Sequence, residues 1–164
     1  MAITAAQVKE LNNATGVGIM DCKRALTENN GDFDAAVKWL REKGMAKAAK
    51  RASKVAAEGV VATFITEDGA KGAIVEVNCE TDFVAKSADF GAFVASVGQA
   101  VLVSAAADAT ALVDATDHGD GRTLTDMLGE LAGKCGEKVE VRRFTRFELS
   151  GAGTLASYIH MGGK

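Results

Sequence analysis

Two β-rich runs flank an Asp-Gly turn in the middle of the chain. They cover residues 60–66 and 73–78, and the connection between them contains Asp68-Gly69. An Asp-Gly pair between two such runs is a strong signal of a β-hairpin. A hairpin makes its strands antiparallel neighbours, and its apolar face needs a second layer to cover it. The chain is therefore restricted to folds with an antiparallel sheet packed against other elements.

Helices are expected before the hairpin. Thr4 suits the N-cap of a first helix, which ends near the turn at residues 15–18. A second apolar-periodic run covers residues 19–26, and Asp32 can cap a third helix. Residues 46–57 are rich in Ala and Lys, which favours a solvated linking helix. The N-terminal part is thus a small three-helix bundle followed by a linking helix.

The pattern after the hairpin adds helices and a third strand. Apolar residues recur every three or four positions from Phe90 to Leu102, which predicts a helix that can cover the sheet. Thr123 can cap a further helix, and residues 139–149 have the pattern of a long strand. Residues 154–160 have the pattern of a fourth strand that has just begun. The predicted fold class is therefore α+β, with an antiparallel sheet covered by helices.

The chain divides into four expected parts. They are a three-helix domain over residues 1–45, a linking helix over 46–57, a first core subdomain over 58–140 and the start of a second over 141–164. A strand without a partner is a poor place for a fold to stop. Because the fourth strand begins shortly before Lys164, we expect that sequence belonging to a further subdomain is missing.

Composition indicates an ordinary soluble chain. Its 164 residues are 48% apolar and 25% charged. No apolar run reaches the roughly 18 residues needed to span a membrane. The N-terminus has neither the basic region nor the apolar region of a signal peptide. We therefore expect a cytoplasmic location.

The sequence offers little for catalysis. It has no GxxxxGK[ST] phosphate-binding motif, and the glycines at residues 15–18 lie between two helices, where they act as turn residues. Three widely spaced cysteines without a CxxC pair indicate reduced thiols and no metal site. Cys79, Asp82 and His160 are the one trio for a thiol nucleophile, and a buried structural Cys79 is the alternative. We expect no enzyme activity and no cofactor.

Basic residues gather at residues 38–54, although the net charge of the chain is -3. Clustered cations on one helical face can bind nucleic acid. Against this, no aromatic residue lies between Lys43 and Lys54 for base stacking, and the chain is acidic overall. A solvated surface or one that faces an acidic protein is the alternative, with Arg51 among the partner contacts. We expect no direct nucleic-acid binding.

The stretch EVNCETDFVAK, at residues 76–86, is the most informative part of the chain. A strand ends in polar residues and is followed at once by Phe83 and Val84, before the next helix begins. Loops that a rigid sheet positions often carry binding residues. The residue pattern alone favours another arrangement, in which Phe83 packs beneath the helix that begins near Ser87. Asp82 could likewise serve only as a cap of that helix.

Two long motifs are specific enough to suggest a family. They are TGVGIMDCKRAL at residues 15–26 and EVNCETDFV at residues 76–84. Both are similar to the signature regions of bacterial elongation factor Ts, and the similarity continues at residues 56–60, 136–139 and 158–160. The resemblance implies a ubiquitin-associated-like three-helix domain, a linking helix and the N-terminal half of a core built from an antiparallel sheet and helices. Longer members of the family continue with a second core subdomain and a protruding coiled coil.

The resemblance also implies a role in translation. Members of the family are guanine nucleotide exchange factors that promote GDP release from elongation factor Tu. In the family, the Thr-Asp-Phe-Val segment inserts into the nucleotide-binding domain of that partner, beside the magnesium and phosphate site. That role would fall on Thr81, Asp82, Phe83 and Val84.

Further partner contacts follow from the same resemblance. The residues that would make them are Val8, Leu11, Asn12, Ile19, Met20, Lys23, Cys135, Gly136 and His160. The partner would be elongation factor Tu in its GDP-bound and nucleotide-free states, no membrane contact is implied, and self-association stays open. The alternative from another class is a helical adaptor on an α+β scaffold that binds a different protein. The identity of the partner separates these two hypotheses.

Overall fold

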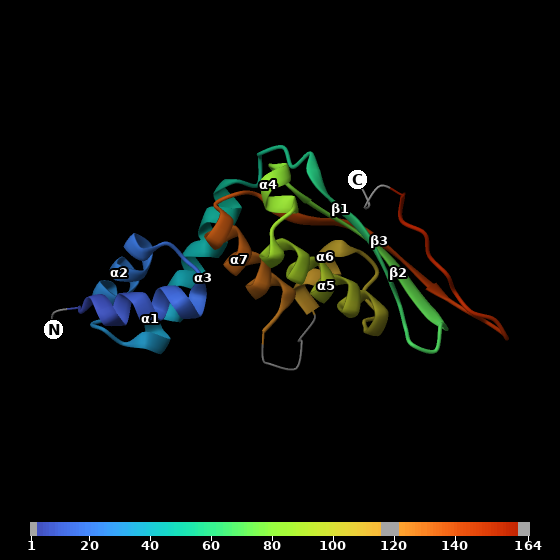
Figure 1. The fold of residues 1–164 in the computed structure, drawn as a ribbon, viewed down its shortest axis with the longest axis horizontal. Helices are drawn as coiled ribbons and strands as arrows, with labels where there is room; N and C mark the ends of the chain where they lie inside the picture. The colour runs from blue at the N-terminus through green and yellow to red at the C-terminus, as the bar shows by residue number, and fades with distance from the viewer. Residues whose placement is uncertain (1–2, 116–121, 161–164) are drawn as a thin grey trace.

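The chain folds into a helical end and a sheet-containing end. A computed structural model describes residues 3–115 and 122–160. Three helices come first, α1 (Ala5–Thr15), α2 (Ile19–Glu28) and α3 (Phe33–Lys50), and α1 and α2 lie at one end of the molecule (Figure 1). A three-stranded antiparallel sheet with its own helices forms the other end. The α+β class expected from the sequence is confirmed.

Local sequence sets the ends of the first three helices. Thr4 caps α1 in a capping box with Gln7, and Gly16 ends that helix in the left-handed region with a φ of 65°. The Asp32 carboxylate accepts a hydrogen bond from the Ala35 amide over 2.9 Å at the start of α3. The buried residues of their shared core are Val8, Leu11, Val17, Cys22, Ala25, Leu26, Ala36 and Leu40.

The helix α3 continues into the segment expected to form a linking helix. It extends without a break through residues 46–50 and ends at Lys50, earlier than the residue 57 expected from the Ala- and Lys-rich pattern. Two contacts explain the earlier end. The Arg51 guanidinium donates a hydrogen bond to the carboxylate of Glu80, which follows the hairpin in the sequence. Ala56 is buried. The chain therefore leaves the helix axis and turns toward the sheet.

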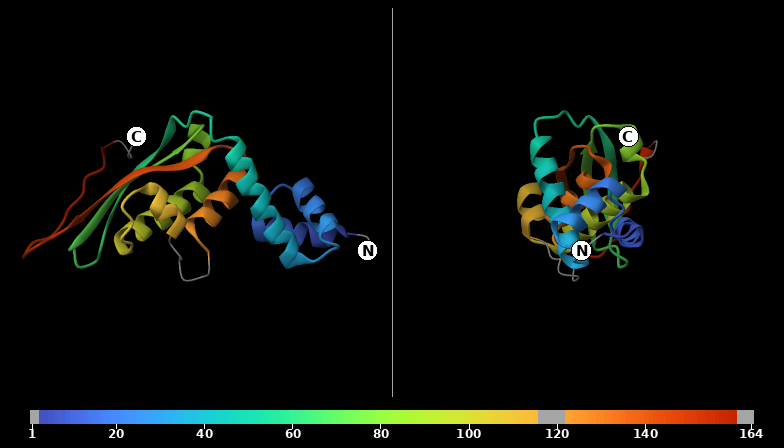
Figure 2. Two further views of the ribbon diagram at one scale, coloured as in Figure 1. Left: turned by 180° about the vertical axis from the view of Figure 1, so that it is seen from behind. Right: turned by 90° about the vertical axis from the view of Figure 1, so that its left-hand side faces the viewer.

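The helix α3 also packs against α7 (Leu124–Cys135) through glycine residues. A Cβ atom on Gly44 would overlap the carbonyl oxygen of Gly129, and it would lie 3.5 Å from the Cα of Gly133. The two backbones therefore approach each other more closely than any larger residue allows. Figure 2 shows α3, in teal, leading from the other N-terminal helices to the sheet-containing end. This contact joins the two ends of the molecule.

The sheet has the order β1-β2-β3, with β1 at Glu58–Ile65, β2 at Lys71–Cys79 and β3 at Val139–Glu148. Both neighbouring pairs are antiparallel. The predicted hairpin turn is confirmed, because Gly69 has a φ of 68° and its amide donates to the Thr66 carbonyl over 2.8 Å. The two long strands of the hairpin thus form the frame on which the rest of this end is built.

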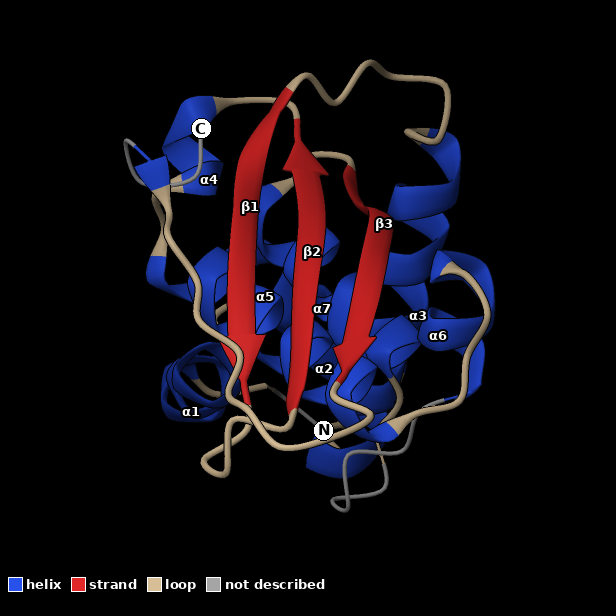
Figure 3. Cartoon of the chain, turned by 90° about the vertical axis from the view of Figure 1, so that its right-hand side faces the viewer, coloured by secondary structure: helices blue, strands red, loops and turns tan. Residues whose placement is uncertain are grey.

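Helices cover one face of the sheet. The helices α5 (Ala88–Val103) and α7 lie behind the strands in Figure 3, and α6 (Ala109–Ala115) lies on the β3 side. In β2, Val75, Val77 and Cys79 alternate toward this layer and are buried. The predicted covering helix and the helix capped by Thr123 are confirmed. The short helix α6 was not predicted, because its Ala-rich sequence shows no clear apolar period.

The segment after β3 does not form the expected fourth strand within the described residues. Residues 153–159 have no regular structure. The Leu155 amide donates to the Gly69 carbonyl over 2.9 Å, but a single bond to the hairpin turn does not make a strand ladder. The expectation of a strand there is therefore wrong. Because β3 runs continuously across residue 140, a division of the core at that point stays a prediction.

Some expectations concern parts of the chain that are not described. Residues 116–121, in the loop expected between α6 and α7, and residues 161–164 lie outside the described residues. None of the helices in the described part combines the length and the apolar character that a membrane crossing requires.

Candidate partner interface

A four-residue helix follows β2 and presents an exposed aromatic ring. This helix, α4 (Asp82–Ala85), is capped by the Thr81 hydroxyl, which accepts a hydrogen bond from the Val84 amide over 3.4 Å. Phe83 is 82% exposed, whereas Val84 and Ala85 pack against the core of the sheet. The expectation that Phe83 packs beneath the next helix is therefore wrong. Its neighbours occupy the inward positions of α4, so the ring points outward.

The carboxylate of Glu137 holds the start of α4. Its Oε1 accepts a hydrogen bond from the Thr81 hydroxyl over 2.7 Å, and its Oε2 accepts one from the Thr81 amide over 3.0 Å. Glu137 lies in the turn between α7 and β3. Hydrogen bonds to an ionised acceptor are stronger than those between neutral groups. The helix that carries Phe83 is thus tied to the α7–β3 turn.

Glu80, the residue before Thr81, joins three parts of the chain. Arg51 donates from Nε and Nη2 to its two carboxylate oxygens, each over 2.7 Å, and the Lys138 amide donates to its Oε1 over 2.5 Å. The Arg51 guanidinium, followed by the Lys138 amide, lowers the pKa of the Glu80 carboxyl to about 2. The same pair raises the pKa of Arg51. Arg51, which we expected to contact a partner, is therefore already engaged within the chain.

We expect the Arg51–Glu80 pair to make the stability of the chain depend on pH in the acid range. The folded chain holds the pKa of Glu80 at about 2, below the usual value of 4.5, so unfolding takes up a proton between these values. The stabilisation is present above the usual pKa and is lost as the pH falls toward 2. The measurement is the free energy of unfolding in urea at decreasing pH. It should fall more steeply for the unchanged chain than for Glu80→Gln, and equal slopes would contradict the assignment.

The carboxylate of Asp82 lies at the surface beside Phe83. Thr81 caps α4 and Ser87 caps α5, so the alternative in which Asp82 serves as the cap of the next helix is wrong. Asp82 Oδ2 accepts a hydrogen bond from Lys86 Nζ over 2.6 Å, and this bond raises the pKa of Lys86. The surface around the ring therefore carries a carboxylate whose charge is partly balanced by a lysine.

A second exposed apolar patch lies on the helical end of the molecule. Ile19 and Met20, at the start of α2, are 59% and 75% exposed. Lys23, one turn further along α2, is also exposed. We call Ile19 and Met20 the α2 patch. Two adjacent large apolar side chains in water are an unusual feature that suits contact with another protein.

The predicted contact residues of α1 face inward. Val8 and Leu11 are buried in the core of the three N-terminal helices. Asn12 is half-buried and donates from Nδ2 to the Val17 carbonyl over 2.8 Å. These side chains therefore support the turn that leads into α2, and a direct contact of theirs with a partner stays a prediction.

The α7–β3 turn places Cys135 and Gly136 next to the contacts that hold α4. Gly136 is exposed and ends α7 with a φ of 71°, while Cys135 is half-buried and burial raises its pKa. The following residue is Glu137, which binds Thr81. His160 is exposed at the end of the described chain.

The structure thus brings together three of the predicted contact regions. Arg51, the segment around α4 and the α7–β3 turn meet through Glu80 and Glu137. The α2 patch is outside this set of contacts, and the start of α2 lies beside the C-terminal part of α3, where Asp21 pairs with Lys47 over 3.0 Å. Sequence reasoning included the two glutamates in family motifs but gave them no role. Only the motif itself could have pointed to them, because their partners are distant in sequence.

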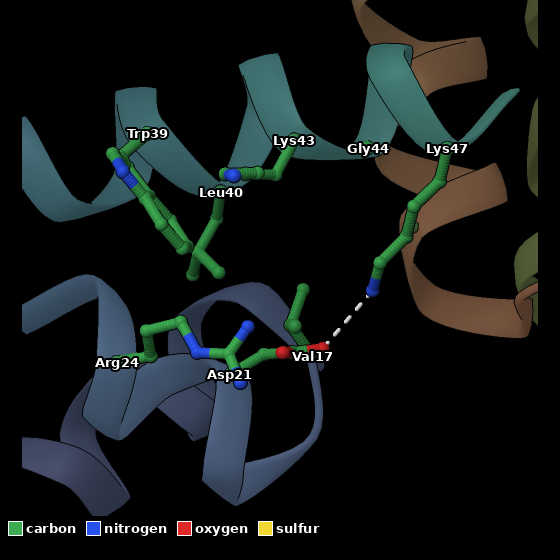
Figure 4. A pocket seen from close by; sticks show the side chains of 9 residues that line it. Val17, Asp21, Arg24, Trp39, Leu40, Lys43, Gly44 and Lys47 are labelled. Carbon is green, nitrogen blue, oxygen red and sulfur yellow. Dashed lines mark hydrogen bonds and ion pairs between the residues drawn. The ribbon is translucent and has the colours of Figure 1, made fainter. Parts of the chain in front are cut away.

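The basic run of α3 lies beside a small pocket between α2 and α3 (Figure 4). Lys47 donates to Asp21 over 3.0 Å, and Lys43 Nζ lies 5.0 Å from the centre of the Trp39 ring. Arg51 is engaged near α4 as well. Several cations of the run are therefore satisfied by groups of the chain itself, which leaves less charge for a phosphate backbone.

The thiol of Cys79 has the properties of a structural residue. It is fully buried, and its Sγ donates to the Thr81 carbonyl over 3.2 Å. Burial raises its pKa to about 11, so the thiol is protonated at neutral pH and unsuited to nucleophilic attack. Within residues 3–115 and 122–160, no group of three or more His, Cys, Asp or Glu residues is placed to hold a metal ion.

Comparison with protein families identifies the chain. The family model described as Elongation factor TS matches residues 80–164, which include α4 and the α7–β3 turn. The chain belongs to the elongation factor Ts family. The resemblance expected from the two motifs is confirmed.

Individual elongation factor Ts proteins are similar along nearly the whole chain. The protein of Clostridium perfringens is 51% identical over 162 residues, which are 99% of this chain and 53% of the relative. That of Thioalkalivibrio sulfidiphilus is 48% identical over 160 residues, covering 98% and 54%. That of Halothermothrix orenii is 46% identical over 165 residues, covering 100% and 54%. The chain therefore spans about half the length of the curated relatives it matches.

Proposed function

We propose that the chain is a guanine nucleotide exchange factor for elongation factor Tu, acting in the cytoplasm by protein binding and without a cofactor. The observation that carries the proposal is the Phe83 ring, which is 82% exposed on a helix held at its base by Glu137. An exposed aromatic side chain on a fixed support is typical of an interface anchor. Membership of the elongation factor Ts family supports the choice of partner.

The proposed mechanism needs no covalent step. A factor that binds nucleotide-free elongation factor Tu more tightly than the GDP form weakens GDP binding by the same ratio, because the two binding equilibria are linked. We propose that Phe83 is buried beside the magnesium and phosphate site only when that site has opened. Burying the ring then favours the open state by roughly 1.5–3 kcal/mol. Asp82 would bring a negative charge toward the phosphate and magnesium groups, where it disturbs their interaction.

The α2 patch supplies a separate docking contact in this proposal. Ile19 and Met20 are exposed and Lys23 is close to them on the same helix, so an apolar contact and a charged contact are available together. Val8 and Leu11 support this surface from the core. Gly136 and His160 complete the proposed set of contacts nearer the sheet.

The test is the release of a fluorescent GDP analogue from elongation factor Tu, followed by stopped flow with and without this chain. Acceleration by substoichiometric amounts of the chain would establish catalytic exchange. Binding without acceleration would mean that the chain docks but does not exchange nucleotide. Neither binding nor acceleration would refute the proposal and favour an adaptor that recognises another protein.

A further inference from the structure

The orientation of α4 cannot come from α4 alone. The helix is a single turn of four residues, and isolated helices of this length are not stable in water. Its largest side chain, Phe83, is exposed and packs little against the chain. Val84 and Ala85 provide only partly buried contacts. The direction in which the ring points must therefore depend on how the first residues of α4 are held.

The Thr81 hydroxyl makes two hydrogen bonds, and the geometry of one depends on the other. Its proton goes to Glu137 Oε1 over 2.7 Å, while its oxygen accepts the Val84 amide over 3.4 Å as the cap of α4. A hydroxyl has one proton and two lone pairs, so donation to Glu137 fixes its rotation and leaves a lone pair for the cap. Glu137 also accepts the Thr81 amide over 3.0 Å. Glu137 thus orients the residue that begins the helix.

The two turns hold each other reciprocally. Glu137 accepts a hydrogen bond from the Thr81 amide. Glu80, the residue before Thr81, accepts one from the amide of Lys138, the residue after Glu137. Each carboxylate therefore satisfies an amide of the opposite turn. We call this pair of contacts the carboxylate clasp. It fixes the β2–α4 turn against the α7–β3 turn at two adjacent points, which restrains rotation as well as distance.

We propose that Glu137 is a positioning residue for nucleotide exchange: through the carboxylate clasp it sets the direction in which α4 presents Phe83. The proposal rests on the proposed exchange function. Because Glu137 acts on the presentation of the ring and not on the α2 patch, it affects the step that follows docking. The saturating rate of GDP release should therefore change, while the concentration of the chain that gives half of that rate should change little.

The experiment compares Glu137→Ala, Glu137→Gln and Glu140→Ala with the unchanged chain. Glu140 is a matched control, because it is a neighbouring carboxylate that pairs with Lys138 Nζ over 2.7 Å, whereas Thr81 donates to Glu137. GDP release from elongation factor Tu is measured over a range of chain concentrations. Hydrogen exchange of the amides of Thr81 and Val84 is measured in the free chain, so that the positioning effect is observed without the partner.

For Glu137→Ala we expect a saturating rate about fivefold lower, as for the loss of one net hydrogen bond, with faster exchange at both amides. Glu137→Gln keeps one acceptor oxygen and should recover part of the rate, and Glu140→Ala should match the unchanged chain. Unchanged amide exchange in Glu137→Ala would overturn the positioning role. Faster exchange with an unchanged release rate would overturn its role in function. No stimulation by the unchanged chain would instead overturn the proposed function, on which this inference rests.

Discussion

Replacing Phe83 by Ala is expected to slow the GDP release stimulated by the chain at least about tenfold, without destabilising the fold. The ring is 82% exposed, so its removal takes away almost no internal contact. In a complex it would be buried, and truncating an aromatic interface anchor typically costs about 2 kcal/mol or more. Since about 1.4 kcal/mol corresponds to a factor of ten, the loss should be visible directly in stopped-flow measurements of GDP release.

A matched control separates this effect from a general loss of exposed apolar surface. Val103, at the end of α5, is 81% exposed and is not among the proposed contacts. Val103→Ala should leave both the release rate and the urea unfolding curve unchanged. Unfolding of Phe83→Ala should also match that of the unchanged chain. A folded Phe83→Ala chain with full stimulation would show that the ring is not the anchor.

The parts of the fold that depend on local sequence were predictable. Gly69 allows the hairpin turn through its positive φ, and Thr4, Asp32 and Thr123 supply the expected helix caps. The helices α4 and α6 were not predicted, because neither is long enough to show an apolar period. For α4, the capping residue Thr81 is bound by Glu137, which lies far away in the sequence.

The candidate site shows the same division between local and distant effects. The motif drew attention to Phe83, but the residue pattern favoured packing beneath the next helix, and only the fold shows that Val84 and Ala85 take the inward positions. Arg51 has the appearance of a free surface cation in the sequence, although it is bound to Glu80. Such pairings join separate segments of the chain, so no periodicity or spacing rule can reveal them.

The contact between α3 and α7 leads to the second large expected effect. Gly44→Ala should lower the free energy of unfolding by about 1–3 kcal/mol, the usual cost of forcing extra atoms into a packed interior. The new Cβ would overlap the Gly129 carbonyl oxygen, which belongs to the backbone and cannot rotate away. The two helices would have to separate. Urea unfolding followed by Trp39 fluorescence and by circular dichroism measures this loss.

Gly91→Ala is the control for Gly44→Ala, because it makes the same substitution within a helix without the steric conflict. Gly91 lies in α5 with open space where its Cβ would be. Ala is favoured over Gly inside a helix by up to about 1 kcal/mol, so Gly91→Ala should stabilise the chain. The same preference partly offsets the cost at Gly44. If both variants were stabilised, the glycine contact between α3 and α7 would be looser than the structure has it, and α3 would be free to move relative to the sheet and to α4, which carries Phe83.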